Sequence, residues 1–144
     1  MNKIFKKKVF FIAEISGNHD QNFKKAKKII KEISKTGADA IKLQTYRPDT
    51  ITLNSDKDDF KIKGGLWDGR TLYELYEEAH MPWGWHKPLF DFAKKLDITI
   101  FSSPFDKTAV DMLEELNAPA YKIASFEMTD HDLVKKVSQT NNLK

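Results

Sequence analysis

Short polar clusters follow four apolar segments of the chain and carry the residue types best suited to chemistry. The clusters are residues 14–19 (EISGNH), 42–45 (KLQT), 102–106 (SSPFD) and 122–127 (KIASFE). After each cluster the pattern turns helical, either directly or after a long loop. In parallel α/β proteins the active site lies beyond the carboxyl ends of the strands. Four such ends can therefore contribute to a single pocket.

Two lysines stand among apolar residues at the ends of expected strands. Alternation along a strand places Lys42 and Gln44 on one face and the apolar residues between them on the other. Lys122 likewise opposes its apolar neighbours. Each lysine needs a partner, because an unpaired buried charge is strongly disfavoured. The partner is either a bound anion, such as a phosphate or carboxylate, or an internal carboxylate such as Glu14 or Glu127.

Hydroxyl, carboxylate and imidazole groups add further candidates at the same strand ends. Ser103, which alternation places on the lysine face, and Ser125 can each donate a hydroxyl to an anion. Glu14 points inward by the same rule, where it can act as a base, orient water or simply pair with a lysine. His19 lies in a Gly-Asn-His turn, where a lone histidine is more often structural than catalytic.

Alternating strand and helix patterns surround these clusters. We expect strands at residues 9–13, 38–43, 98–101 and 120–123 and helices at 22–36, 71–79, 85–96, 107–116 and 131–138. Gly37 stands at an expected helix C-terminus, and Asp106 and Asp130 stand at expected N-caps. The repeated strand–helix order predicts an α/β fold with parallel strands and right-handed crossovers. The polar stretch 44–70 has the length of a functional lid or binding loop.

Length and composition bound the class of protein. The 144 residues, 40% hydrophobic and 31% charged, suit one globular domain. A formal charge of +3 is too small to indicate nucleic-acid binding. The chain has no cysteine and its four histidines lack HExxH-type spacing, so we expect neither disulfides nor a self-contained metal site. With no signal-peptide pattern and no bilayer-length apolar run, the sequence predicts a cytoplasmic protein without membrane contact.

Four segments of the sequence resemble the sialic acid synthase family. They are residues 13–19 (AEISGNH), 37–46 (GADAIKLQTY), 101–106 (FSSPFD) and 119–127 (PAYKIASFE). Residues 66–90 (LWDGRTLYELYEEAHMPWGWHKPLF) look most like the pseudaminic acid synthase branch of that family. Its enzymes condense phosphoenolpyruvate with an amino sugar to give a nonulosonic acid and phosphate. The expected function is therefore this reaction in surface-glycan biosynthesis.

The resemblance also implies a fold. Residues 1–144 would be the N-terminal half, about four βα units, of a (β/α)8 TIM barrel. The second half of the barrel and a C-terminal antifreeze-like domain would lie outside this chain. We therefore expect the isolated chain to be inactive, and the open edges of its first and fourth strands to promote self-association.

Carried over position by position, the resemblance assigns roles to the candidate residues. The residues similar to the phosphoenolpyruvate ligands are Lys42, Ser103, Lys122 and Ser125. Glu14 and Glu127 resemble active-site carboxylates. Gln44, Asn18 and His19 match positions expected to contact the acceptor sugar. Ser103 stands where many relatives have threonine, so the hydroxyl is kept.

The chemistry implied by the family is attack by C3 of phosphoenolpyruvate on the aldehyde of an open-chain sugar. For the pseudaminic branch that sugar would be 2,4-diacetamido-2,4,6-trideoxy-altrose. A divalent metal, Mn or Mg, would polarise the carbonyl, with ligands outside this chain, in an enzyme expected to be a homodimer. Two alternatives stay open: a synthase for N-acetylneuraminic or legionaminic acid, and a truncated remnant without catalytic role.

Overall fold

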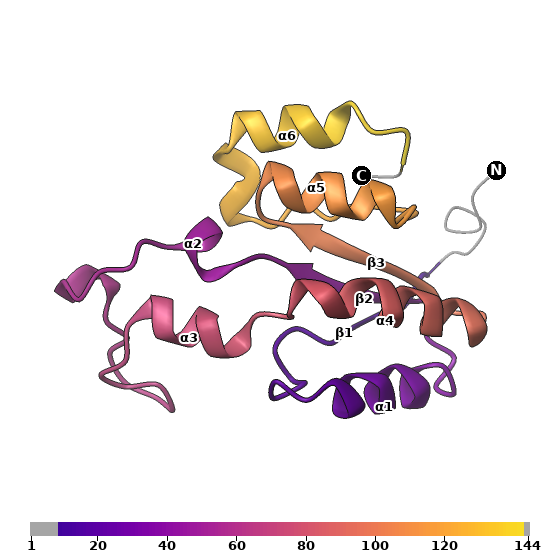
Figure 1. The fold of residues 1–144 in the computed structure, drawn as a ribbon, viewed down its shortest axis with the longest axis horizontal. Coiled ribbons are helices and arrows are strands. Elements are labelled where there is room, and N and C mark those ends of the chain that lie inside the picture. The colour runs from indigo at the N-terminus through magenta and orange to yellow at the C-terminus, as the bar shows by residue number, and fades with distance from the viewer. Residues whose placement is uncertain (1–8, 143–144) are drawn as a thin grey trace.

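A computed structural model describes residues 9–142 and shows a parallel sheet flanked by helices (Figure 1). The strands are β1 (Ile12–Glu14), β2 (Ala40–Thr45) and β3 (Thr99–Pro104), in the spatial order β1-β2-β3. The helices are α1 (Phe23–Ile33), α2 (Pro48–Ile51), η2 (Asp58–Phe60), α3 (Leu72–Ala79), α4 (Trp83–Lys95), α5 (Lys107–Glu115), η3 (Phe126–Thr129) and α6 (His131–Ser138). The chain is thus an α/β protein with parallel strands, as predicted, and its sheet is consistent with part of a barrel.

Side-chain caps fix where several helices begin. The Asn22 side chain accepts a hydrogen bond from the Lys25 amide, which starts α1 one residue later than expected. Asp106 and Asp130 cap α5 and α6 as predicted. Gly37 has a φ of +83°, a left-handed conformation that glycine adopts without steric penalty after a helix.

The two faces of the sheet differ in what covers them. Ile41 and Leu43 pack with α1, α4, α5 and α6 into the main apolar core. Figure 1 shows α1 beside α4 and α5 beside α6 along the strands. On the opposite face Ala40, Phe101 and Ala120 form a smaller apolar cluster. The predicted alternation along β2 is therefore confirmed, and it leaves the even-numbered residues Lys42 and Gln44 on the face away from the helices.

The predicted fourth strand is wrong in its extent. Among the contacts within residues 9–142, the segment 120–123 has an isolated parallel bridge between Tyr121 and Ser102, and a hydrogen bond from the Lys122 amide to the Ser102 carbonyl at 3.2 Å. A parallel ladder continued past this point would need an N–H from residue 104 to reach the Lys122 carbonyl. Residue 104 is proline and has no N–H, so the ladder stops and the chain turns into η3.

The long connection after β2 is also more ordered than a polar loop. It contains α2 and η2, and an antiparallel bridge between Lys61 and Thr71 closes a hairpin before α3.

On the free edge of β1, Phe11 and Ile12 are exposed apolar residues. The self-association expected from that edge stays a prediction. Within residues 9–142, none of the helices combines the length and apolarity needed to cross a bilayer.

Candidate functional site

The strand register brings the predicted site residues together at the carboxyl ends of β1, β2 and β3. Glu14 is the cross-strand partner of Lys42, and Gln44 is the partner of Ser103. All four side chains belong to the face that the helices leave uncovered, because each has the same parity as Ala40 or Phe101. Residues far apart in sequence thus form one short polar row.

Lys42 and Glu14 form an ion pair at the start of this row. Lys42 Nζ donates to Glu14 Oε1 at 2.5 Å, and the lysine side chain is only 11% exposed. The Ser16 hydroxyl donates to the same carboxylate oxygen at 3.0 Å. The internal carboxylate, one of the two partners considered for Lys42, is therefore in direct contact with it.

Glu14 is held in its ionised form. Burial of the carboxyl raises its pKa, but the hydrogen bonds from Lys42 and Ser16 and the charges of Lys42 and Lys122 outweigh that effect and lower the pKa below its usual value. A carboxylate with 42% of its side chain exposed is both charged and reachable from solvent. It is suited to accept a proton or to orient a water molecule.

Ser103 presents a hydroxyl without a partner. Its side chain is 1% exposed, and its Oγ finds no hydrogen-bond acceptor or donor among the described residues. Buried polar groups are normally paired, because an unmade hydrogen bond costs about 1–3 kcal/mol. This donor lies in register with Gln44, in the row that also holds Lys42. An anion bound over the row would satisfy it.

The residues after β3 contribute a second group of charges. Lys122 is exposed and makes no ion pair within the described part of the chain, while Ser125 is exposed just before η3. Glu127 has one carboxylate oxygen buried without a hydrogen-bond partner in residues 9–142. Burial raises the pKa of Glu127, although a backbone hydrogen bond and the charge of Lys122 oppose the increase. The pKa of Glu127 is therefore shifted upward, whereas the pKa of Glu14 is shifted downward.

The turn that carries Asn18 and His19 has its two side chains in different surroundings. The Asn18 amide donates to the Ile15 carbonyl at 2.9 Å and is otherwise exposed. His19 is fully buried, with its ring edge-on to Trp85 at a centroid distance of 5.4 Å and its Nδ1 accepting from the Gln21 amide. The structure thus places His19 in the helix layer rather than in the polar row.

Sequence reasoning missed a buried hydrogen-bonded chain beside the site. His86 Nε2 lies 2.9 Å from Thr45 Oγ1, which in turn lies 2.7 Å from Ser102 Oγ. Burial lowers the pKa of His86 to about 4, so its ring is neutral at pH 7. These residues join α4, β2 and β3 at the same end of the sheet. No local pattern indicates the contact, because 41 and 57 residues separate its members.

The described residues do not form a metal-binding site by themselves. Among residues 9–142 no three His, Cys, Asp or Glu side chains come close enough together to hold one. Mn²⁺ and Mg²⁺ prefer several oxygen or imidazole ligands in a defined geometry. A metal at this site would need ligands from elsewhere, and that expectation stays a prediction.

A parallel α/β sheet with cations, hydroxyls and carboxylates at the carboxyl ends of its strands has the arrangement found in barrel enzymes. The chain belongs to the NeuB family, whose profile matches residues 29–143. It is 55% identical over 133 residues to the pseudaminic acid synthase of Campylobacter jejuni, covering 92% of this chain and 39% of that protein. It is 53% identical over 129 residues to the pseudaminic acid synthase of Helicobacter pylori, covering 90% of this chain and 38% of that one.

Solved structures agree with this assignment. The N-acetylneuraminic acid synthetase from Leptospira borgpetersenii superposes with a TM-score of 0.74 at 26% identity, covering 90% of this chain and 41% of that protein. The spore coat polysaccharide biosynthesis protein SpsE from Bacillus subtilis gives a TM-score of 0.69 at 29% identity, covering 93% and 34%. The chain thus spans about 39% of the length of the Campylobacter jejuni pseudaminic acid synthases that it matches.

Proposed function

We propose that residues 1–144 form the N-terminal part of the barrel of a pseudaminic acid synthase. The enzyme condenses phosphoenolpyruvate with 2,4-diacetamido-2,4,6-trideoxy-altrose to give a nonulosonic acid and phosphate. The observation that carries the proposal is the unpartnered Ser103 hydroxyl in the row of Lys42, Glu14 and Gln44. Identity supports this branch over another, since a legionaminic acid synthase of Campylobacter jejuni is only 33% identical.

Phosphoenolpyruvate is the ligand that suits this set of donors. Its phosphate and carboxylate carry the negative charge that Lys42 and Lys122 can neutralise, and Ser103 and Ser125 can each donate a hydroxyl. Charge-assisted hydrogen bonds are roughly twice as strong as neutral ones, so the lysines supply most of the affinity. The same cations stabilise the charge that develops on the departing phosphate.

The two carboxyl groups are suited to opposite proton-transfer roles. Glu14 is kept ionised by Lys42, so we assign it the base that accepts a proton from the water adding to C2. Burial raises the pKa of Glu127, which favours a proton donor. Environments that push two carboxyl pKa values apart are a general way to set acid and base roles. C–O cleavage at C2 then releases phosphate.

The acceptor sugar would lie beside the phosphoenolpyruvate, against Gln44 and Asn18. Both side chains carry an amide that can donate to and accept from sugar hydroxyl and acetamido groups. His19 is buried against Trp85 and would contribute to this side of the site through the turn that it shares with Asn18. The divalent metal and the second subunit of a homodimer belong to the complete enzyme. The metal would polarise the aldehyde, and the second subunit would complete the dimer.

A segment exchange tests this function. Residues 10–142 would replace the matching segment of the Campylobacter jejuni pseudaminic acid synthase, and phosphate release would be measured with altrose- and mannose-derived acceptors. The proposal requires turnover with the diacetamido-altrose and little with N-acetylmannosamine. A folded chimera that binds phosphoenolpyruvate but turns over only N-acetylmannosamine would move the chain to the N-acetylneuraminate branch. A folded chimera without any phosphoenolpyruvate binding would overturn the anion site itself.

A further inference from the structure

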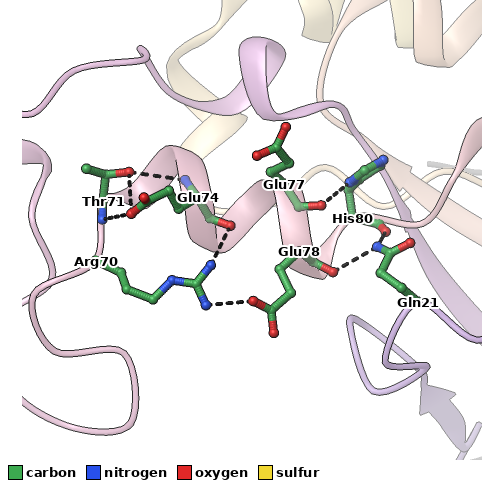
Figure 2. Close-up of polar contacts among 7 residues, drawn as sticks. All are labelled: Gln21, Arg70, Thr71, Glu74, Glu77, Glu78 and His80. Atoms are coloured by element: carbon green, nitrogen blue, oxygen red, sulfur yellow. Dashed lines mark hydrogen bonds and ion pairs between the residues drawn. The ribbon is translucent and has the colours of Figure 1, made fainter.

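The end of α3 holds the loop that follows β1. Figure 2 shows the Gln21 side chain at the C-terminus of α3, where its amide donates to the carbonyls of Glu78 at 2.8 Å and His80 at 2.6 Å. The last carbonyls of a helix have no partners within the helix. Here a side chain from another part of the chain takes that role, across 57 and 59 residues of sequence.

The loop itself is held in conformations that a free chain would avoid. Ser16, Asp20 and Gln21 all have φ values of 48–49°, in the left-handed region. Each such residue costs about 1–2 kcal/mol relative to ordinary backbone. Strain of this kind persists only where the surroundings over-determine it, and it clusters at functional sites. The contacts with α3 are surroundings of this kind.

A close backbone approach adds to the amide contact. A Cβ placed on Gly17 would lie 3.1 Å from both the Cβ and the carbonyl oxygen of Ala79, the last residue of α3. An alanine at this position would require the loop or the helix end to shift by a few tenths of an ångström. Gly17 and Gln21 thus fasten both halves of the loop to the same helix end.

Helix α3 is in turn fixed at its other end. Its N-terminus has a capping box, in which Thr71 and Glu74 exchange side-chain and backbone hydrogen bonds. Arg70 pairs with Glu78 at 2.6 Å and stacks on Trp67 at 5.0 Å, as its guanidinium also donates to the Glu74 carbonyl. Figure 2 shows the contacts of Arg70 and Thr71 with Glu74 and Glu78 along the helix. The helix therefore offers the loop a fixed support.

The other end of the loop touches the candidate site. The Ser16 hydroxyl and the Lys42 ammonium both donate to Oε1 of Glu14. Oε2 of Glu14 accepts no hydrogen bond from these two donors or from any other residue in 9–142. The orientation of the carboxylate thus depends on where the loop places Ser16.

We propose that Gln21 is a positioning residue for Glu14. By holding the loop on the end of α3, it keeps the Ser16 hydroxyl on Oε1 and directs Oε2 towards the substrate side of the row. The role assigned to Oε2 rests on the proposed function, whereas the link from Gln21 through Ser16 to Glu14 does not. This link can therefore be tested without phosphoenolpyruvate or sugar.

The test is an NMR titration of the Glu14 side-chain carboxyl in the 144-residue chain, with its signal assigned by Glu14→Gln. Ser16→Ala removes the direct donor, and we expect it to raise the pKa of Glu14. Gln21→Met removes the loop anchor, and we expect at least half of that increase. Lys42 and Lys122, the cations that act on Glu14, are unchanged in both variants.

Two further variants make the result decisive. Gln139→Met, at an exposed position after α6, is the matched control and should titrate as the wild type. Gly17→Ala, whose methyl group would crowd Ala79 and shift the loop, should raise the Glu14 pKa in the same direction as Gln21→Met. A wild-type titration in both loop variants would overturn the proposal, as would a Ser16→Ala variant that leaves Glu14 unchanged. An increase shared by Ser16→Ala, Gln21→Met and Gly17→Ala, with Gln139→Met titrating as the wild type, would support it.

Discussion

Glu14 and Lys42 are direct partners in the β1–β2 register, and their side chains close to 2.5 Å. The sequence allowed either a bound anion or an internal carboxylate as the partner of this lysine. The two are compatible, because Lys42 contacts an internal carboxylate and still lies in the row where an anion would bind. Lys42 satisfies its charge with one oxygen of Glu14 and retains two other N–H groups. It can therefore bind a phosphate without releasing its carboxylate partner.

Replacing Lys42 by methionine should weaken phosphoenolpyruvate binding. Loss of one charge-assisted hydrogen bond is worth about 1.5–3 kcal/mol, which is roughly a 10- to 100-fold change in Kd. The same change should raise the pKa of Glu14, because its nearest cation is gone. Calorimetric titration with phosphoenolpyruvate and NMR titration of Glu14 measure the two effects. Lys87→Met, which removes the exposed Lys87–Asp91 pair, is the control and should change neither.

Ser103→Ala should separate binding from stability. Its hydroxyl has no hydrogen-bond partner among the described residues, so its removal should leave the free energy of unfolding unchanged or slightly higher. Loss of a donor to the anion should still weaken phosphoenolpyruvate binding about tenfold. Denaturant melts and binding titrations report the two quantities. A variant that binds as the wild type does would remove Ser103 from the site.

The neighbouring serine provides the reverse case. Ser102 is also buried, but its hydroxyl lies 2.7 Å from that of Thr45. Ser102→Ala should cost about 1–2 kcal/mol of unfolding free energy, because it leaves the Thr45–His86 pair without its third member. Phosphoenolpyruvate affinity should stay at the wild-type level, since Ser102 belongs to the helix-covered face. Equal losses of affinity in the two serine variants would contradict the assignment of faces.

His86 should make the fold sensitive to mild acid. Burial lowers its pKa from 6.5 to about 4, so the unfolded chain binds more protons than the folded one between these values. The contribution of the neutral His86 ring to the free energy of unfolding is complete above pH 6.5 and is lost as the pH falls towards 4. The difference corresponds to roughly 3 kcal/mol at most. Melting temperatures across this range should fall more steeply for the wild type than for His86→Gln, and parallel curves would contradict the prediction.

Glu127→Gln should stabilise the protein at neutral pH. Burial raises the pKa of this carboxyl above its value in the unfolded chain, so stability is lost as the pH rises from the unfolded pKa through the folded one. A neutral amide removes that effect, and a small rise in Tm is expected at pH 7. Near pH 4 the carboxyl is largely protonated in the folded protein and the difference should shrink. A lower Tm for the variant at pH 7 would show that the charge pairs with Lys122 instead.

Alternation along the strands predicted which residues share a face, because the pleat has a fixed period of two residues. It placed Lys42, Gln44 and Ser103 together, and the register confirms this arrangement. The helices were found from their caps and apolar periodicity. These features are local, and local sequence determines them.

What the sequence could not predict depends on distant contacts. The predicted extent of the fourth strand was wrong because the proline that ends its hydrogen-bonded ladder, Pro104, lies on a different strand. The resemblance assigned His19 to the acceptor sugar, whereas the structure packs its ring against Trp85 of α4 in the helix layer. The anchoring of Gln21 on α3 likewise joins segments with no common pattern. Whether the assigned residues bind substrate stays a prediction for the experiments above.

The single bridge at Tyr121 has a consequence for how a ligand would be received. β2 is hydrogen-bonded along its length to β1 and β3, so Lys42 and Gln44 lie on the most firmly held strand of the described sheet. In the described part of the chain, the segment before Lys122 and Ser125 meets β3 in one isolated bridge, at Tyr121. A ligand would therefore meet a preformed half-site on β2 and an adjustable one after Tyr121. Such a division lets one cluster recognise an anion while the other adapts its distance to the substrate.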